Sequence, residues 1–540
     1  MKNTVYSFKM LSLLIVLAFS NYSMAQEVSL KKQDVKTKEK ITTHFSGHLS
    51  GNADAYDDKS RLKSTDVKKM LQIVWDAWKE ANNKFSEQKL INLDKLEKAN
   101  SGKWTLPQEL EPNAIMPYYW GYKGDSEPEG GFSLYLYTHG SGDKTSEWRT
   151  GINICQKFDD APSVYFIPQI PNMGDYYRWW QKAKQFAWEK MLRLAFVSGK
   201  INPNKVYFFG ISEGGYGSQR LASFYADYLA AAGPMAGGEP LKNAPVENCR
   251  NIAFSLLTGA NDRGFYRNKL TQRTKDEFDK LEKANPGNFI HRIELIPGMG
   301  HGIDYKLTTP WLKQYTRNPY PKHVSWENFE MDGLYRNGFY NLFVEERSND
   351  DTQSRTHYEM DIQENNISLK IDLVTYKATE IDPNWGIELD FEKSYQPATK
   401  GKVIIYLNDK LVDLNKEITL VVNGKEAFKG KVKPQLKNMV NSCAAFFDPE
   451  RIYPAAIEVS EVPTIKNPKE QSLGIFLYIS WTQHLNAILH HQRNTCFHGI
   501  LVRSHSRIVK WRHTLLFRWT DTQDPEYSRN LLQVNGKIFS

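Results

Sequence analysis

The sequence is poor in cysteine, and its four cysteines are far apart. Cys155, Cys249, Cys443 and Cys496 are spread over 540 residues, and no two of them form a C-x-x-C pair. This excludes zinc-finger and thioredoxin-like proteins, which need closely spaced cysteine pairs. An oxidising compartment would permit a disulfide, but this spacing does not identify a pairing.

The body of the chain also lacks an excess of charge of either sign. Of the net charge of +8, the first 25 residues hold Lys2 and Lys9 and no acid, and residues 466–540 hold ten Lys and Arg against four Asp and Glu. Residues 26–465 are therefore close to neutral, without the basic surface that nucleic-acid binding requires. No metal-ligand cluster, phosphate-binding loop or dinucleotide fingerprint is recognisable, so the sequence implies no metal and no cofactor.

The first 25 residues have the pattern of a cleavable signal peptide. Lys2 and Lys9 form a positively charged N-terminal segment before the apolar run Met10–Phe19. Ser23-Met24-Ala25 then forms a small-x-small cleavage site. The run is shorter than the roughly 20 residues that span a bilayer, and no cysteine follows to carry a lipid anchor. We expect cleavage after Ala25, export to the periplasm or the medium, and no membrane span.

Residues 26–114 are expected to form a leader and one helix. The stretch 26–60 is polar and rich in Lys, Asp and Ser, which predicts a loose leader. The stretch 66–85 predicts a surface helix that packs on the following domain. Its apolar face would consist of Leu71, Val74, Trp75, Trp78 and Phe85.

Residues 115–349 alternate between short apolar strands and helices, which is typical of a mostly parallel sheet with helices on both faces. Strands are predicted at 133–138, 163–168, 205–210, 252–258 and 290–296, with a long aromatic helix at 176–198. After residue 350 the apolar residues alternate, and 418–422 runs into Asn423-Gly424, a strong hairpin signal. This predicts a small antiparallel β domain over 350–462.

The strand at 205–210 leads into Gly210-Ile211-Ser212-Glu213-Gly214-Gly215, a G-x-S-x-G motif followed by a helix. In this context the serine lies on a sharp turn that needs small neighbours. The N-terminus of the helix directs N–H groups at developing negative charge. Ser212 is therefore the predicted nucleophile.

A serine nucleophile needs a general base, and the base needs a carboxylate. His301 lies in the glycine-flanked loop 297–302, directly after the last strand of the series, and is the predicted base. Asp262 follows the strand at 252–258, so the chain order Ser212, Asp262, His301 is the one that α/β-hydrolases require. Asp304 is the alternative acid, ranked lower because only three residues separate it from the base.

An oxyanion hole needs two backbone donors. We expect the N–H of Glu213 and that of Ser141 in the loop His139-Gly140-Ser141-Gly142, with Gly142 as the alternative. An aromatic cluster after the strand at 163–168 could stack a sugar or phenolic ring, although helix packing explains it equally well. The cluster consists of Tyr176, Tyr177, Trp179 and Trp180.

The motifs THGSG, FFGISEGG, TGAND and PGMGHG resemble those of α/β-hydrolase esterases. The resemblance covers about 115–345 and points to dienelactone hydrolases, polyhydroxybutyrate-depolymerase-like proteins, feruloyl and acetyl-xylan esterases, and prolyl-oligopeptidase-like proteins. Segments 317–327 and 406–430 resemble the exit from the catalytic domain and the appended β domain of secreted bacterial esterases and peptidases. The resemblance implies an α/β-hydrolase fold and Ser-His-Asp hydrolysis, and it does not specify the substrate.

Three functions remain open. The first is a carboxylesterase acting on acylated carbohydrate or a related natural polymer, with a small-molecule or polysaccharide-linked ester as substrate. The second is a serine peptidase of the prolyl-oligopeptidase type; such enzymes usually carry a large N-terminal propeller, whereas only about 90 residues lie between the signal peptide and the catalytic domain here. The third is a non-catalytic binding protein, which an intact triad disfavours. The sequence does not predict an oligomeric state.

The tail, 463–540, differs in composition from the rest of the chain. Residues 471–520 contain no Asp or Glu but hold six of the 13 histidines, and their apolar residues follow no sustained period. We interpret the tail as the product of a reading-frame shift, and expect it to be unnecessary for catalysis. A basic, aromatic module that binds a membrane or polyanion is the alternative.

Overall fold

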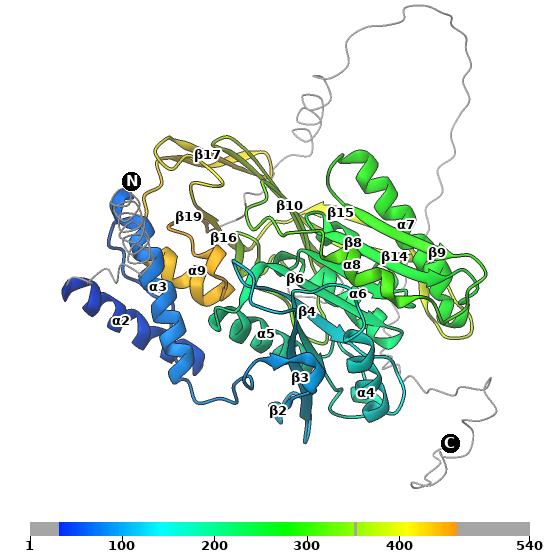
Figure 1. The fold of residues 1–540 in the computed structure, drawn as a ribbon. Helices are drawn as coiled ribbons and strands as arrows, with labels where there is room; N and C mark the ends of the chain where they lie inside the picture. Colours follow the sequence, from blue (N-terminus) through cyan, green and yellow to red (C-terminus); the bar gives the residue numbers. More distant parts are fainter. Residues whose placement is uncertain (1–31, 350–353, 461, 463–540) are drawn as a thin grey trace, which may run out of the picture. The chain divides into compact units, whose positions relative to one another are not determined.

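A nine-stranded sheet forms the centre of the protein (Figure 1). The structure is a computed structural model that describes residues 32–349, 354–460 and 462. The strands of this sheet are β1 (Asp94–Lys95), β2 (Ser101–Thr105), β3 (Ile115–Lys123), β4 (Phe132–Thr138), β5 (Ser163–Pro168), β6 (Ile201–Ile211), β7 (Ala231–Met235), β8 (Ala253–Gly259) and β9 (His291–Ile296).

The sheet is mostly parallel, as the sequence predicts. Its order is β1-β3-β5-β4-β6-β7-β8-β9, with β2 paired to β3. Strands β4 to β9 are parallel to one another, whereas β3 is antiparallel to both β2 and β5. The central strands are buried along almost their whole length, which explains their nearly continuous apolar sequences.

Helices cover both faces of this sheet. Leu134 and Leu136 of β4 belong to the hydrophobic cluster that includes the apolar residues of α5, α6 and α7, whereas Tyr135 and Tyr137 belong to the cluster with α4 and α8. The alternation follows from the two-residue period of a strand. The helices are α4 (Lys144–Cys155), α5 (Lys182–Val197), α6 (Glu213–Phe224), α7 (Arg267–Ala284) and α8 (Thr308–Leu312).

The N-terminal region is more ordered than its composition predicts. Residues Lys32–Leu49 form α2, so the expected loose leader over 26–60 is wrong for this part. The helix is polar overall, but it buries Ile41 and Phe45 in a cluster with α3 (Ser64–Lys84) and α9 (Leu436–Phe446). Helix α3 contacts α2, α5 and α9. The predicted apolar face is only partly correct: Val74 and Trp78 are buried, whereas Leu71, Trp75 and Phe85 are half-buried, and Met70, Ile73, Ala77 and Ala81 complete the buried stripe.

The C-terminal region contains two further sheets. One has the order β10-β13-β14-β17-β18 with β15 on β14, and the other has the order β11-β12-β16-β19. All pairings are antiparallel except that of β14 with β17. Their strands are β10 (His323–Asn328), β11 (Gly338–Phe339), β12 (Leu342–Glu346), β13 (Ser354–Gln363), β14 (Asn366–Ile381), β15 (Glu388–Pro397), β16 (Lys402–Leu407), β17 (Ile418–Val422), β18 (Lys425–Gly430) and β19 (Ala455–Val459).

This β region differs from the prediction in two respects. It begins with β10 near residue 323 instead of residue 350, because short strands such as β11 and β12 show too little alternation to be recognised. It also shares one continuous hydrophobic cluster with the parallel sheet, in which Val324 and Tyr358 pack together with residues of α5 and α6. The β region is therefore part of the main core.

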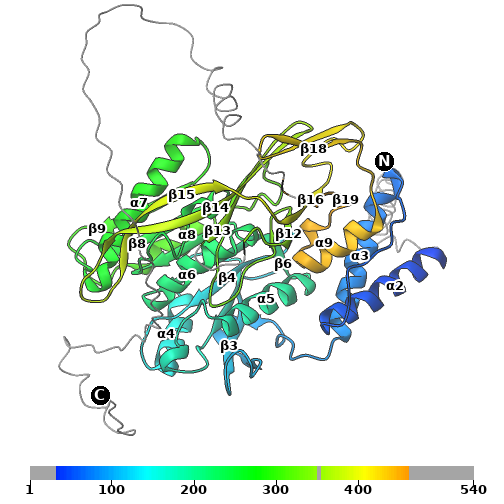
Figure 2. The ribbon, with the colours of Figure 1, turned by 180° about the vertical axis from the view of Figure 1, so that it is seen from behind.

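One hairpin of the β region is unusually long. Strands β14 and β15 pair from Asp372 and Pro397 at one end to Ile381 and Glu388 at the other. Both views show the outer part of this hairpin beside α7 and β8 (Figures 1 and 2). The hairpin thereby brings a part of the β region to the edge of the parallel sheet.

Among the described residues, no helix has the length and apolar character that a membrane crossing needs. The described cysteines, Cys155, Cys249 and Cys443, are buried free thiols. Cys496, the expected signal peptide and the whole tail, 463–540, lie outside the described residues.

Candidate active site

Ser212 lies on a sharp turn between β6 and α6. Its backbone has φ 57° and ψ −116°, a strained conformation for a residue other than glycine. A Cβ atom on Gly214 would overlap the carbonyl oxygen of Thr138, and one on Gly210 would overlap the Thr138 hydroxyl. Both positions flanking the turn therefore require glycine, which gives the motif its G-x-S-x-G form.

The structure brings Ser212, His301 and Asp262 together from three different loops. His301 Nε2 lies 2.9 Å from Ser212 Oγ, and His301 Nδ1 lies 2.7 Å from Asp262 Oδ2. The His301 side chain is 44% exposed, whereas the Asp262 side chain is only 3% exposed. Asp304, the alternative acid, instead accepts a hydrogen bond from the backbone N–H of Lys306 at 3.0 Å.

Asp262 has a second strong partner that sequence reasoning missed. Arg267 Nε donates to both carboxylate oxygens at 2.9 Å, and Arg267 Nη2 lies 2.8 Å from Oδ1. Burial by itself would raise the pKa of Asp262, but the hydrogen bonds from His301 and Arg267 hold that pKa below its usual value. The carboxylate is therefore ionised and can only accept, which places the proton of His301 on Nδ1 and leaves Nε2 free to accept.

The two expected oxyanion donors lie on segments next to Ser212. The N–H of Glu213 begins α6, and the N–H of Ser141 belongs to the loop after β4. Among the described residues neither amide has a hydrogen-bond partner. A Cβ on Gly140 would first contact the Glu147 carboxylate, the Ile211 carbonyl oxygen and Ser212 Cβ, so this loop lies against Ser212.

Buried aromatic residues fix the loop after β4. Trp179 Nε1 donates to the carbonyl oxygen of His139 at 2.9 Å, and the Tyr177 hydroxyl donates to that of Gly140 at 2.7 Å. The ring of His139 accepts from the Ile170 N–H at 3.1 Å. Burial lowers the pKa of His139 to about 4, so this histidine is neutral at physiological pH and has a structural role.

These contacts correct part of the predicted ring-binding cluster. Trp179 and Tyr177 are buried and hold the loop, so they cannot stack on a substrate. Trp180 is half-buried beneath Arg220, whose guanidinium lies 4.2 Å from the ring centre. Tyr176 alone of the four is exposed, at 38%. The helix expected from residue 176 starts only at Lys182, so the cluster lies on an irregular segment.

Glu213, the residue after Ser212, carries a buried carboxyl group with few partners. Its Oε2 lies 3.5 Å from Arg178 Nη1, and its Oε1 has no hydrogen-bond partner. Burial raises the pKa of Glu213 to about 7; Arg178 opposes the shift and the nearby Glu239 adds to it. This carboxyl group therefore changes protonation near neutral pH, directly beside Ser212.

The raised pKa predicts a pH-dependent effect of Glu213→Gln on stability. The folded-state pKa exceeds the ordinary value of 4.5, so ionisation destabilises the folded wild type as pH rises from about 4.5 through 7, whereas glutamine does not ionise. Relative to wild type, the variant should gain about 3 kcal/mol in free energy of unfolding between pH 4 and pH 8. Urea unfolding at both pH values measures this, with Glu109→Gln on an exposed residue as the control. An equal difference at both pH values would contradict the buried-carboxyl interpretation.

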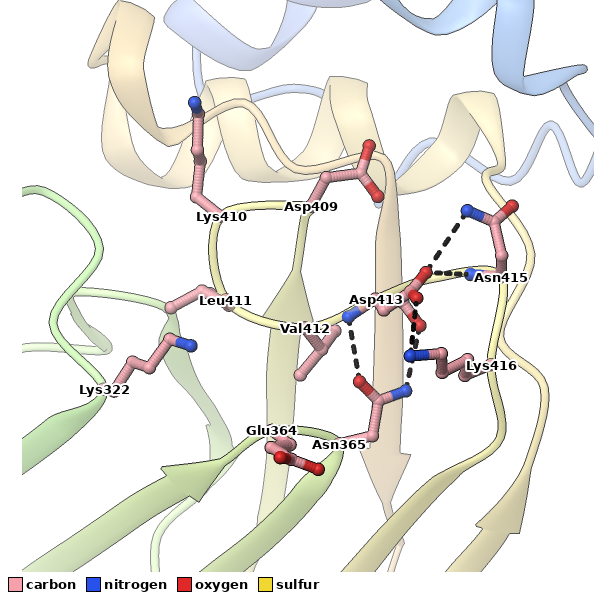
Figure 3. A pocket seen from close by; sticks show the side chains of 10 residues that line it. All are labelled: Lys322, Glu364, Asn365, Asp409, Lys410, Leu411, Val412, Asp413, Asn415 and Lys416. Atoms are coloured by element: carbon pink, nitrogen blue, oxygen red, sulfur yellow. Dashed lines mark hydrogen bonds and ion pairs between the residues drawn. The ribbon is translucent and has the colours of Figure 1, made fainter.

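Two cavities lie away from the triad. One, of about 550 Å³, is lined by Lys322, Asn365 and the turn 409–416 (Figure 3). Polar groups that line this cavity form hydrogen bonds with each other. Asn365 Oδ1 accepts from the Asp413 N–H, and Asn365 Nδ2 donates to the Asp413 carbonyl oxygen, both at 2.9 Å. The other, of about 1100 Å³, lies between α2, α3, α5 and α9. Neither cavity includes a triad residue.

No protein-family model and no curated protein matches the sequence. Several solved structures are similar over about two fifths of the chain. A thermostable esterase is 17% identical with a TM-score of 0.31, and the match covers 41% of this chain and 64% of that one. A ferulic acid esterase is 13% identical with a TM-score of 0.30, over 40% of this chain and 97% of that one. Esterase 2 of Thermogutta terrifontis is 13% identical with a TM-score of 0.31, over 41% and 92%.

Proposed function

We propose that this chain is an exported serine hydrolase of the α/β-hydrolase type that cleaves carboxylic esters through an acyl-enzyme on Ser212. The hydrogen-bonded series Ser212, His301, Asp262 carries the proposal, with distances of 2.9 Å and 2.7 Å. The positions of the three residues support it as well, since they follow β6, β8 and β9 at the carboxyl edge of the parallel sheet.

In this mechanism Ser212 Oγ attacks the ester carbonyl while His301 Nε2 takes the hydroxyl proton. Asp262 stabilises the imidazolium that forms, and the N–H groups of Glu213 and Ser141 stabilise the oxyanion. His301 then gives the proton to the departing alcohol, which leaves an acyl group on Ser212. A water molecule, deprotonated by the same histidine, releases the acid and restores the serine.

An ester is favoured over a peptide bond because of the architecture of the residues before β3. Residues 32–114 form α2, α3 and two short strands, and this described part contains no propeller that could gate access to the triad. We propose acylated carbohydrate or a related natural polymer as the substrate. A serine peptidase is the second candidate, since the same triad would cleave an amide.

Labelling with a fluorophosphonate probe tests the proposal, because the probe reacts only with an activated serine. The wild-type protein should be labelled, and Ser212→Ala should not. A parallel screen against acetyl esters, feruloyl esters and peptide anilides then separates the candidates. Cleavage of anilides without any ester would favour the peptidase, and the absence of labelling would favour a non-catalytic protein.

A further inference from the structure

The tip of the β14–β15 hairpin contacts the loop that carries the catalytic acid. Tyr266, four residues after Asp262, donates its hydroxyl to the carboxylate of Asp382 at the tip. The ring of Phe265 lies 5.5 Å from that of Trp385, measured between ring centres. The guanidinium of Arg267, which holds Asp262, lies 5.7 Å from the Phe265 ring centre. Trp385 is therefore linked to the triad through a short series of contacts.

The acid loop has an unusual backbone at this contact. Phe265 and Tyr266 both adopt left-handed conformations, with φ of 50° and 60°. Bulky residues are disfavoured there, and such strain persists only where the surroundings fix it. Here the hairpin supplies that support, because both side chains contact its tip.

The hairpin tip is itself well fixed. The Trp385 N–H donates to Asp382 Oδ2 at 2.5 Å, and the Asp382 N–H donates to the Ile387 carbonyl at 2.8 Å. Arg273 of α7 bridges the two strands of the hairpin, 3.2 Å from Glu380 and 3.1 Å from Asp390. Trp385 is nevertheless 40% exposed, so a fixed backbone presents a large indole to solvent.

Several exposed large apolar side chains lie on the hairpin and on segments that follow strands of the parallel sheet. Six such residues lie on the hairpin or on the segments after β5 and β9, which follow the carboxyl ends of those two strands. They are Met173, Tyr176, Met299, Leu307, Ile381 and Trp385.

We propose that Trp385, together with Phe265, forms a ring-binding surface at the entrance of the active site. Its ligand is a ring with apolar faces attached to the scissile ester, either a phenolic ring on the acyl side or a sugar ring on the alcohol side. The inference rests on the proposed function, because it places this ring beside the same triad. An aromatic side chain suits both rings, since its face packs against another flat apolar face.

Binding to the inactive Ser212→Ala protein tests the proposal without hydrolysis. Methyl ferulate and acetylated xylotriose are titrated into this protein by calorimetry, alone and with a second substitution. Trp385→Ala should weaken binding of at least one of them by about tenfold, and Trp385→Phe should recover most of the loss. Tyr395→Ala is the matched control, because Tyr395 is an exposed aromatic residue on the same hairpin but away from its tip; it should leave both affinities unchanged. The ligand that responds identifies which side of the ester carries the ring.

Equal affinities in Trp385→Ala and Tyr395→Ala, or no binding of either ligand to the starting protein, would overturn the ring-binding surface. A kinetic comparison in the active protein adds a second criterion. Trp385→Ala should lower kcat/KM for methyl ferulate or acetylated xylotriose relative to kcat/KM for ethyl acetate, which has no ring. An equal fall for all esters would show that the tip only supports the acid loop. If the protein binds rings through Trp385 but hydrolyses no ester, the proposed function fails while the surface stands.

Discussion

Replacing Ser212 with alanine should reduce ester hydrolysis by at least about a thousandfold while the protein stays folded. The substitution removes the only atom that can form the acyl-enzyme, and the oxyanion donors alone retain a small part of the catalysis. Because alanine adds no atoms to the crowded turn around Gly210 and Gly214, the backbone can keep its strained conformation. The initial rate with p-nitrophenyl acetate, compared at equal folded concentration, measures the loss.

Three further variants test the assignment of the base and the acid in the same assay. His301→Ala should lose about as much activity as Ser212→Ala, because the two residues act as one unit. Asp262→Asn should lose an equal or smaller amount, whereas Asp304→Asn should remain close to wild type, since Asp304 caps the turn at Lys306. Activity of Ser212→Ala within tenfold of wild type would rule out this nucleophile, and a damaging Asp304→Asn would identify a different acid.

The local pattern of apolar residues in the sequence is sufficient to predict the strands that position these residues. The strand predicted at 163–168 coincides with β5, and those predicted at 205–210 and 252–258 lie within or one residue from β6 and β8. Such strands are buried on both faces, so each is a short apolar run bounded by glycine or polar residues. The role of the glycines around Ser212 could also be predicted from the sequence. Positions 210 and 214 leave no room for a Cβ, so only glycine fits there.

Other elements have no local signature. Strand β7 is Ala231–Met235, whose sequence AAGPM has neither β-branched nor aromatic residues, and only its neighbours β6 and β8 make it a strand. Helix α2 is polar in composition, and its few apolar residues matter only because α3 and α9 cover them. In both cases tertiary packing outweighs local preference.

The side-chain contacts around the candidate site could not be predicted from the sequence. Arg267 is close to Asp262 in the chain, but nothing in the pattern shows that its side chain turns back onto the acid. The contact of Trp385 with Phe265 joins residues that are 120 positions apart. These interactions depend on how the β region packs on the parallel sheet, and no spacing rule encodes that arrangement.

The same packing creates a buried network of charges between the two regions. Asp227 follows α6, and its carboxylate contacts Arg336 and lies 2.5 Å from Arg451 Nη1. Asp448 lies 2.7 Å from Arg317 Nη1 and 3.0 Å from Arg451 Nε. Although burial alone would raise the pKa of Asp227, the guanidinium groups of Arg336 and Arg451 lower it. Three cations thus share two anions in a region with almost no exposure to water.

Asp227→Asn should therefore destabilise the protein by about 3–5 kcal/mol, because it leaves three buried guanidinium groups with one carboxylate. Arg451→Met should cost less, since it leaves two cations with two anions, and the double variant should be more stable than the sum of the two single losses predicts. The free energies of unfolding from urea titrations of the four proteins give the coupling directly. Because the network joins the parallel sheet to the β region, fluorescence and far-UV circular dichroism should report a single transition. A loss below about 1 kcal/mol for Asp227→Asn, or strictly additive single effects, would mean that water reaches these charges and that the two regions are held together by their shared apolar core alone.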